Sequence, residues 1–234
     1  FNHNLETVRE RYRVNADGSE TNLSPLVGSN AELTIDGSAW TPTFNAGVLW
    51  QPHPRVSVGA TILSRSDPAI SGPILVEYGD DAPDPHYQLE GSQTTHLVLP
   101  WTFMGGVHVD VTPNLEIGTE LRYFLYRQFQ QQVTDVSGVL FVNQLVTPKN
   151  YHDSILVSGG IRVHDLAFAP ALELMLGTHY DKTPAPTTTV TLEQPSFPHV
   201  GLHTGARYSA GRYRFGLSYA LYYYMIPTIT DSIT

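Results

Sequence analysis

The ten histidines are the residues of this sequence best suited to metal binding, and the sequence has no cysteine. His199 and His203 are four residues apart, so on a strand they share a face but lie roughly 13 Å apart, at about 3.3 Å per residue. That separation is too large for both to hold one ion, and no histidine pair falls at helical spacing in a credible helix. We therefore expect no metal site and no cofactor, and interpret the histidines as polar residues of an interior or of loops.

A hydrolytic site would need a nucleophile with an activating partner. Ser158 and His164 are predicted to share a face, with Asp110 elsewhere on it, but no Gly-x-Ser-x-Gly sequence is present. Scattered Ser, His and Asp residues are expected by chance in a polar interior. The sequence therefore predicts that the protein is not an enzyme.

Period-two alternation of apolar and polar residues dominates the sequence and predicts β-strands. In 212–223 every odd position is a large apolar or aromatic residue, and every even position except Tyr222 is polar or small. The same alternation predicts strands at 43–51, 55–65, 102–111, 114–126, 154–164, 171–181 and 200–209. A ninth strand near 3–14 has poorer alternation.

The connections between these segments alternate in length, which is typical of outer-membrane barrels. The short ones are 52–54, 112–113, 165–170 and 209–211. The long ones, rich in Gly, Pro, Asp, Thr and Gln, are roughly 15–38, 66–95, 127–152 and 182–198.

Aromatic residues lie near both ends of the apolar rows, as in the two interfacial girdles of a membrane barrel. They are Trp50, Tyr208 and Tyr213 near short turns, and Tyr123, Tyr180 and Tyr223 near long loops. Strands of about ten residues also fit a tilted bilayer crossing better than the average soluble strand of about 5–6 residues.

We therefore expect an all-β protein, with 1–234 forming a single antiparallel transmembrane β-barrel domain whose apolar rows face lipid. A soluble sandwich also alternates, and on periodicity alone it remains an alternative. The net charge of −9 argues against a nucleic-acid partner. Nine strands are an odd number and cannot close an antiparallel barrel, so we expect a missing segment or a partner chain to complete it.

Four stretches resemble the FadL-type family of outer-membrane long-chain fatty acid and toluene transporters. Residues 36–65 are similar to its Gly-x-x-Trp and Asn-Ala-Gly strand, short turn and following strand. Residues 97–129 are similar to its Leu-Pro strand and the strand after it, and 150–163 to a strand opening. Residues 176–208, with LGTHYDKTPAP and QPSFPHVGLHTGARYS, are similar to its Asp-x-(Ser/Thr)-Pro-x-Pro loop and next strand.

The resemblance implies a 14-stranded barrel with an N-terminal hatch, integral in the outer membrane of a Gram-negative bacterium. It implies uptake of hydrophobic small molecules such as fatty acids or aromatic hydrocarbons, with outer-membrane lipid as the surroundings. The chain matches only the later part of that barrel, so we expect it to be incomplete at both ends.

Seven apolar residues interrupt the polar face, and we interpret them as lining a path for hydrophobic ligands, because such sites are mostly apolar with a few polar anchors. They are Leu49, Leu63, Met104, Phe124, Leu156, Met175 and Tyr222. Candidate head-group anchors are Arg65, Arg122, Arg162 and Arg207, since a guanidinium binds carboxylates well. Packing against a hatch or a neighbouring strand explains the apolar residues equally well. The functional alternative is a structural or adhesive barrel of a larger surface assembly, without transport.

Overall fold

The computed structural model describes residues 12–14, 20–22, 31–78, 88–138, 143–190 and 196–228. The chain divides into two compact units. Unit 1 comprises Phe1–Thr41, Asp67–Val98 and Gln131–Thr147, and unit 2 comprises Pro42–Ser66, Leu99–Gln130 and Pro148–Thr234.

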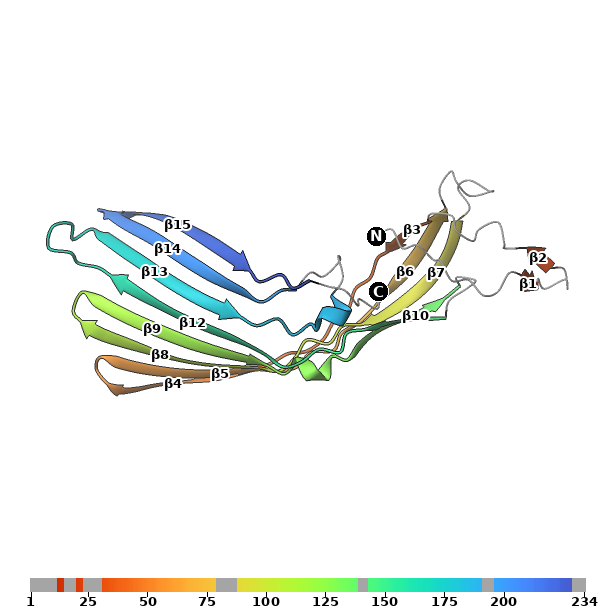
Figure 1. The fold of residues 1–234 in the computed structure, drawn as a ribbon, viewed down its shortest axis with the longest axis horizontal. Coiled ribbons are helices and arrows are strands. Elements are labelled where there is room, and N and C mark those ends of the chain that lie inside the picture. The colour runs from red at the N-terminus through yellow and green to blue at the C-terminus, as the bar shows by residue number, and fades with distance from the viewer. Residues whose placement is uncertain are drawn as a thin grey trace. The chain divides into compact units, whose positions relative to one another are not determined.

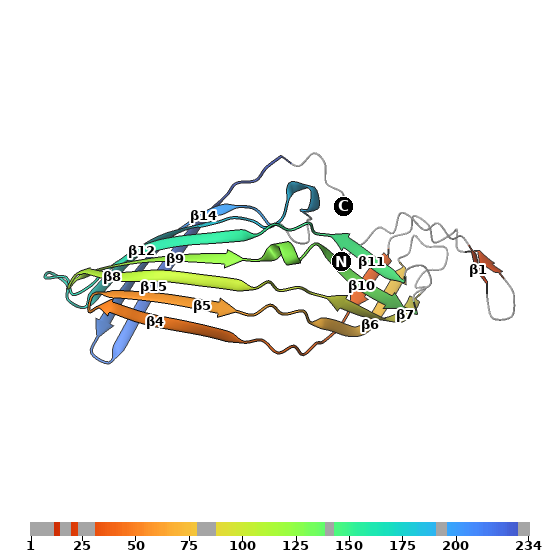
Figure 2. The ribbon, with the colours of Figure 1, turned by 90° about the horizontal axis from the view of Figure 1, so that it is seen from below.

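Unit 2 contains an eight-stranded antiparallel sheet whose strands lie side by side in sequence order (Figure 1). Its last strands, β14 and β15, run at a steep angle to β4 and β5 as the sheet bends (Figure 2). The strands are β4 (Asn45–His53), β5 (Val56–Leu63), β8 (Thr102–Thr112), β9 (Leu115–Phe124), β12 (Ser154–Val163), β13 (Leu172–Asp181), β14 (His199–Ala210) and β15 (Tyr213–Tyr224). The prediction of eight alternating strands between 43 and 223 is therefore confirmed.

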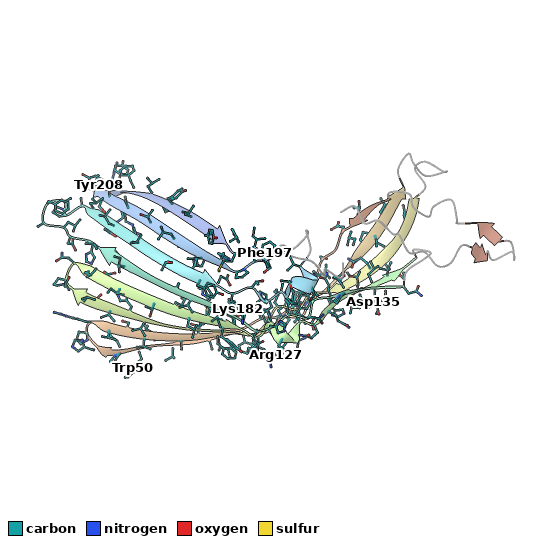
Figure 3. The ribbon with its side chains drawn as sticks, in the orientation of Figure 1. Trp50, Arg127, Asp135, Lys182, Phe197 and Tyr208 are labelled. Atoms are coloured by element: carbon teal, nitrogen blue, oxygen red, sulfur yellow. The ribbon has the colours of Figure 1, made fainter. Side chains whose placement is uncertain are left out.

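The short turns join these strands at one end of the sheet. Gly211 takes a positive φ of 59° in the turn between β14 and β15, a conformation that glycine adopts without steric cost. Asn114, in the turn between β8 and β9, donates from its side-chain amide to the carbonyls of His164 and Asp165, at 3.2 and 2.8 Å. These bonds fix neighbouring turns to each other. Trp50 and Tyr208 lie toward this end of the strands, and Phe197 and Arg127 toward the other (Figure 3).

The apolar rows of the sheet are exposed rather than buried. Leu217 is 79% exposed, and the rows of β8, β9, β12, β13 and β14 are exposed in the same way. All six predicted girdle aromatics are exposed as well. A soluble sandwich would cover one face of such a sheet, whereas a membrane barrel exposes these residues to lipid. Within the described residues β4 and β15 are the edges of the sheet and do not pair with each other, so the barrel is partial.

Unit 1 contains a second antiparallel sheet, in the order β11-β10-β7-β6-β3. Its strands are β3 (Ala31–Ile35), β6 (Ala69–Tyr78), β7 (Gln88–His96), β10 (Gln131–Ser137) and β11 (Gln144–Pro148). The interpretation of 15–38, 66–95 and 127–152 as long loops was wrong, because all three stretches contain paired strands. They lack alternation since they pair largely through polar side chains, such as Ser71 with Thr94 at 2.9 Å and Ser92 with Ser137 at 2.8 Å.

The predicted strand near 3–14 lies mostly outside the described residues. Only its end is described, as β1 (Tyr12–Val14), which pairs with β2 (Glu20–Asn22). Two short 3₁₀ helices, η2 (Tyr126–Gln128) and η3 (Thr187–Thr189), belong to unit 2. No helix within the described ranges is both long and apolar enough to span a membrane.

Candidate functional site

The polar face of the unit 2 sheet is assembled from directly opposed residues, which point to the same side of an antiparallel sheet. One row shows this well: Gly118 of β9 lies opposite Gly160 of β12, which lies opposite Gly177 of β13. Gly59 of β5 and Gly106 of β8 are opposed to each other in the adjacent row of the same face, which continues to Glu120 of β9. We call these five residues the glycine row.

The glycine row forms the floor of an open hollow of about 780 Å³, the central hollow. Since glycine has no side chain, the hollow follows directly from the run of glycines across the strands. Leu49, Met104 and Leu156 contribute apolar walls, and Arg122, His179 and His203 are also in its lining. The volume falls within the ~300–1,000 Å³ range of small-molecule sites.

A second hollow of about 590 Å³ adjoins the central one and shares Gly118, Gly160 and Gly177 with it. Met175 lines this second hollow together with Arg162 and Arg207. Both hollows therefore combine an apolar residue expected on the ligand path with arginines expected as anchors.

The remaining predicted path residues lie apart from the central hollow. Phe124 lines a third hollow of about 430 Å³ with Tyr126 and Tyr151. Leu63 shares a row with Thr102 and Phe124 at the loop end of the sheet. Tyr222 is on β15, opposite Gly201.

Arg122, Arg162 and Arg207 make ion pairs on the polar face of the sheet. Arg122 pairs with Glu120, and Arg162 pairs with Glu116 at 3.1 Å and Glu173 at 3.0 Å. Arg207 also pairs with Glu173, at 3.2 Å. The fourth, Arg65, is exposed and follows the end of β5.

These pairs form part of a ladder of alternating charge across β9, β12, β13 and β14. His164 extends it with nitrogens 3.0 Å from Glu116 and 2.7 Å from Asp165. His164 is thus engaged by acidic side chains at the turn end of the sheet. The partners of each charge in this ladder could not be predicted from the sequence, because they depend on the register between strands.

The loop end of unit 2 is held by a cluster of rings. Tyr151 makes edge contacts with Tyr126 and Phe129, at centroid distances of 5.9 and 5.4 Å. Burial raises the pKa of the Tyr126 and Tyr151 hydroxyls, so both remain neutral donors.

Asp153 connects this ring cluster to the start of β12. Its carboxylate accepts the backbone N–H of Arg127 at 3.0 Å and the Tyr123 hydroxyl at 3.0 Å. The Arg127 N–H bond is the main reason that the pKa of Asp153 lies below its ordinary value.

Three histidines meet on the polar face of β13 and β14, although the sequence showed only two on one strand. His179 lies opposite Gly201, and its ring occupies the space that a side chain at 201 would fill, between His199 and His203. His179 Nδ1 and His203 Nε2 are 2.8 Å apart, and the His179 and His199 ring centroids are 5.2 Å apart. Tyr222 lies 5.7 Å from each of the three rings. We call these four residues the histidine cluster.

The rings of the histidine cluster meet mostly edge to face, and a hydrogen bond joins His179 to His203. Across the part of the chain that the structure describes, no three His, Cys, Asp or Glu side chains are arranged to hold a metal ion. A sequence signal for the cluster existed in Gly201, the one position between His199 and His203 on their face of the strand. The partner ring could not be identified without the register of β13.

Comparisons with known proteins agree with the antiparallel β-barrel fold. The family model described as "Outer membrane protein transport protein (OMPP1/FadL/TodX)" matches residues 4–214. No curated protein sequence matches the chain.

Three solved structures resemble the chain at low sequence identity. A Pseudomonas aeruginosa FadL homologue has a TM-score of 0.70 at 18% identity, and the Ralstonia pickettii toluene transporter TbuX has a TM-score of 0.61 at 18%. The Pseudomonas putida toluene transporter TodX has a TM-score of 0.60 at 13%. Each likeness covers 82% of this chain and 46–47% of the other, so the chain spans about half the length of these proteins.

Proposed function

Because this chain belongs to the outer membrane protein transport protein family (OMPP1/FadL/TodX), we propose that it forms part of a barrel that carries hydrophobic small molecules through its interior. Members of the family are integral outer-membrane β-barrels of Gram-negative bacteria and are transporters rather than enzymes. The family resemblance, the localisation and the absence of an enzymatic role expected from the sequence are therefore confirmed.

The central hollow is the observation that carries this proposal. A water-filled pore would gain nothing from Leu49, Met104 and Leu156 in a lining that consists mostly of polar residues and glycine. A hydrophobic ligand lying on the glycine row would contact all three. Burying apolar ligand surface there contributes about 25 cal/mol per Å².

The charge pattern favours neutral ligands, such as aromatic hydrocarbons, over fatty-acid anions. Arg122, Arg162 and Arg207 already have acidic partners within the chain. A ligand carboxylate would have to displace one of those partners, and the displaced carboxylate would then lose its own cation. The solved relatives TbuX and TodX, which are named as toluene transporters, support the same assignment.

Uptake of labelled toluene and labelled dodecanoate by intact Gram-negative cells tests the proposal, since the outer leaflet of such cells resists passive entry of both. Cells that carry the protein should take up toluene faster than cells without it. Met104→Asp and Leu156→Asp should each reduce this gain, because a carboxylate on the hollow wall opposes an apolar ligand.

Met104→Leu and Leu156→Met are the matched controls, since they preserve the apolar wall and should keep the native uptake rate. Heat-modified mobility on gels shows whether each variant is folded. Uptake equal to that of cells without the protein would contradict transport and favour a structural barrel. Native uptake by folded Asp variants would contradict the path through the central hollow.

A further inference from the structure

The histidine cluster contains a hydrogen bond that fixes what the cluster offers to a ligand. His179 Nδ1 and His203 Nε2 share one proton, so one ring donates and the other accepts. In neutral imidazole only one of the two nitrogens carries a proton. The donating ring therefore has an acceptor as its second nitrogen, and the accepting ring has an N–H as its second nitrogen.

The hydrogen-bonding groups that the pair offers to a ligand do not depend on which ring donates. Either way, the neutral pair presents one spare donor and one spare acceptor, on His179 Nε2 and His203 Nδ1. Neither nitrogen is hydrogen-bonded to another described residue. An imidazole is neutral at pH 8, well above its ordinary pKa of about 6.5.

The pair is accessible from the central hollow, whose lining includes both rings. The residues directly opposite His203 are small, Gly177 on β13 and Ala220 on β15. Ser158 on β12 opposes His179 on its other side. The wall of the hollow therefore has a polar notch at this point, beside Leu156 and the glycine row.

The surroundings of the notch favour a ring-shaped neutral ligand. Tyr222 and His199 are aromatic rings next to the pair, with centroids 5.7 and 5.2 Å from that of His179, and aromatic rings pack well against another ring. Asp181 lies opposite His199, so the nearest charge on these strands is negative. An anionic ligand would meet that charge unfavourably, whereas a neutral one would not.

We propose that the His179–His203 pair binds the hydroxyl group of neutral phenols, so that the protein prefers alkylphenols to hydrocarbons of the same shape. A hydroxyl both donates and accepts, so it can bond either spare nitrogen. A bare hydrocarbon leaves both nitrogens without a partner. This inference rests on the proposed function, because it assigns a substrate class to the same interior path.

Equilibrium binding of p-cresol and toluene to the detergent-solubilised protein at pH 8 tests the inference. The two ligands differ by one hydroxyl. One hydrogen bond corresponds to a factor of about 2–10 in affinity. In the double variant His179→Phe/His203→Phe, the ratio of cresol to toluene affinity should fall by such a factor, with toluene affinity kept within about twofold.

His199→Phe is the matched control, because it also replaces a cluster imidazole by a ring but leaves the hydrogen-bonded pair intact. It should keep the native ratio. A second arm leaves all histidines in place: Gly201→Ala displaces the His179 ring, whereas a methyl at Gly205 meets only ordinary contacts of 3.6 Å or more. Gly201→Ala should lower the ratio, and Gly205→Ala should not.

A native ratio in both the folded double variant and Gly201→Ala would overturn the phenol assignment while leaving hydrophobic transport intact. An equal fall of the affinity ratio in His199→Phe would also overturn the assignment, because the effect would then belong to the whole histidine cluster and not to the hydrogen-bonded pair. If the native protein binds neither ligand, both this inference and the proposed function are wrong.

Discussion

The orientation of the unit 2 sheet can be tested at two adjacent residues of β12. Val157 is on the apolar face, 44% exposed, opposite Leu121 and Tyr180. Ser158 is on the polar face and lines the central hollow, opposite Glu120 and His179. Both have described strands on each side, so the comparison does not depend on the edges of the sheet. Val157→Arg would place a charge in lipid, and Ser158→Arg would place the same charge in the interior.

The two substitutions should differ by several kcal/mol. Both residues lie near the middle of β12, and an arginine at the lipid-facing midplane of a barrel costs about 2–4 kcal/mol. That range corresponds to about 30- to 1,000-fold in the folding equilibrium. The interior position is open and has Glu120 nearby, so Ser158→Arg should change the free energy of unfolding by about 0.5 kcal/mol or less.

Urea unfolding of the protein in lipid vesicles, followed by heat-modified gel mobility, measures the difference. We expect a lower unfolding midpoint for Val157→Arg than for Ser158→Arg. Equal midpoints, or a larger loss for Ser158→Arg, would refute the assignment of the apolar face to lipid.

Three further outcomes are expected. The pKa of the Asp153 carboxyl lies below its ordinary value, so its contribution to stability is complete above about pH 4 and is lost as the pH falls through the lowered pKa. Asp153→Asn should therefore reduce the dependence of the free energy of unfolding on pH in that acid range, and an unchanged dependence would contradict this. Glu173→Gln removes the carboxylate shared by Arg162 and Arg207 and should lower the free energy of unfolding in urea by about 1–3 kcal/mol, between the values for exposed and buried ion pairs. An unchanged free energy of unfolding would show that the ladder does not stabilise the protein. Gly72→Ala should destabilise unit 1 by about 1–3 kcal/mol in limited proteolysis, because a methyl there meets the backbone of Asp36 and Gly37, whereas Gly216→Ala in unit 2 meets nothing and should be neutral.

The strands of unit 2 were predictable because each separates two different environments. In β15 the odd positions face outward and the even positions inward, so apolar residues alternate with polar or small ones through most of 213–224. The short turns were predictable because Pro113 and Gly211 interrupt this alternation between strands. The strands of unit 1 were not, because β7 (QLEGSQTTH) has no apolar row and its hydroxyl and amide pairs leave no periodic signal.

The candidate site was only partly predictable. The sequence placed Leu49, Met104 and Leu156 on the polar face, and the structure gathers them around one hollow. Their role as ligand contacts remains a prediction. The pairs of Arg162 with Glu116 and of Arg207 with Glu173 depend on register, and register between strands joined by long connections cannot be derived from composition.

The glycine row allows the depth of the central hollow to change in small steps. A methyl group added at Gly118 or Gly59 would meet its nearest neighbours at 3.9 and 3.8 Å, which is ordinary van der Waals contact. At Gly106 the same methyl would lie 2.9 Å from the Thr119 carbonyl oxygen, so that position resists change. Single substitutions at Gly118 and Gly59 can therefore make the central hollow shallower by one carbon, without disturbing the strands that form it. Along the proposed ligand path, the size of ligand that fits can change at these two positions independently of stability, because a methyl group at either one displaces no neighbouring atom.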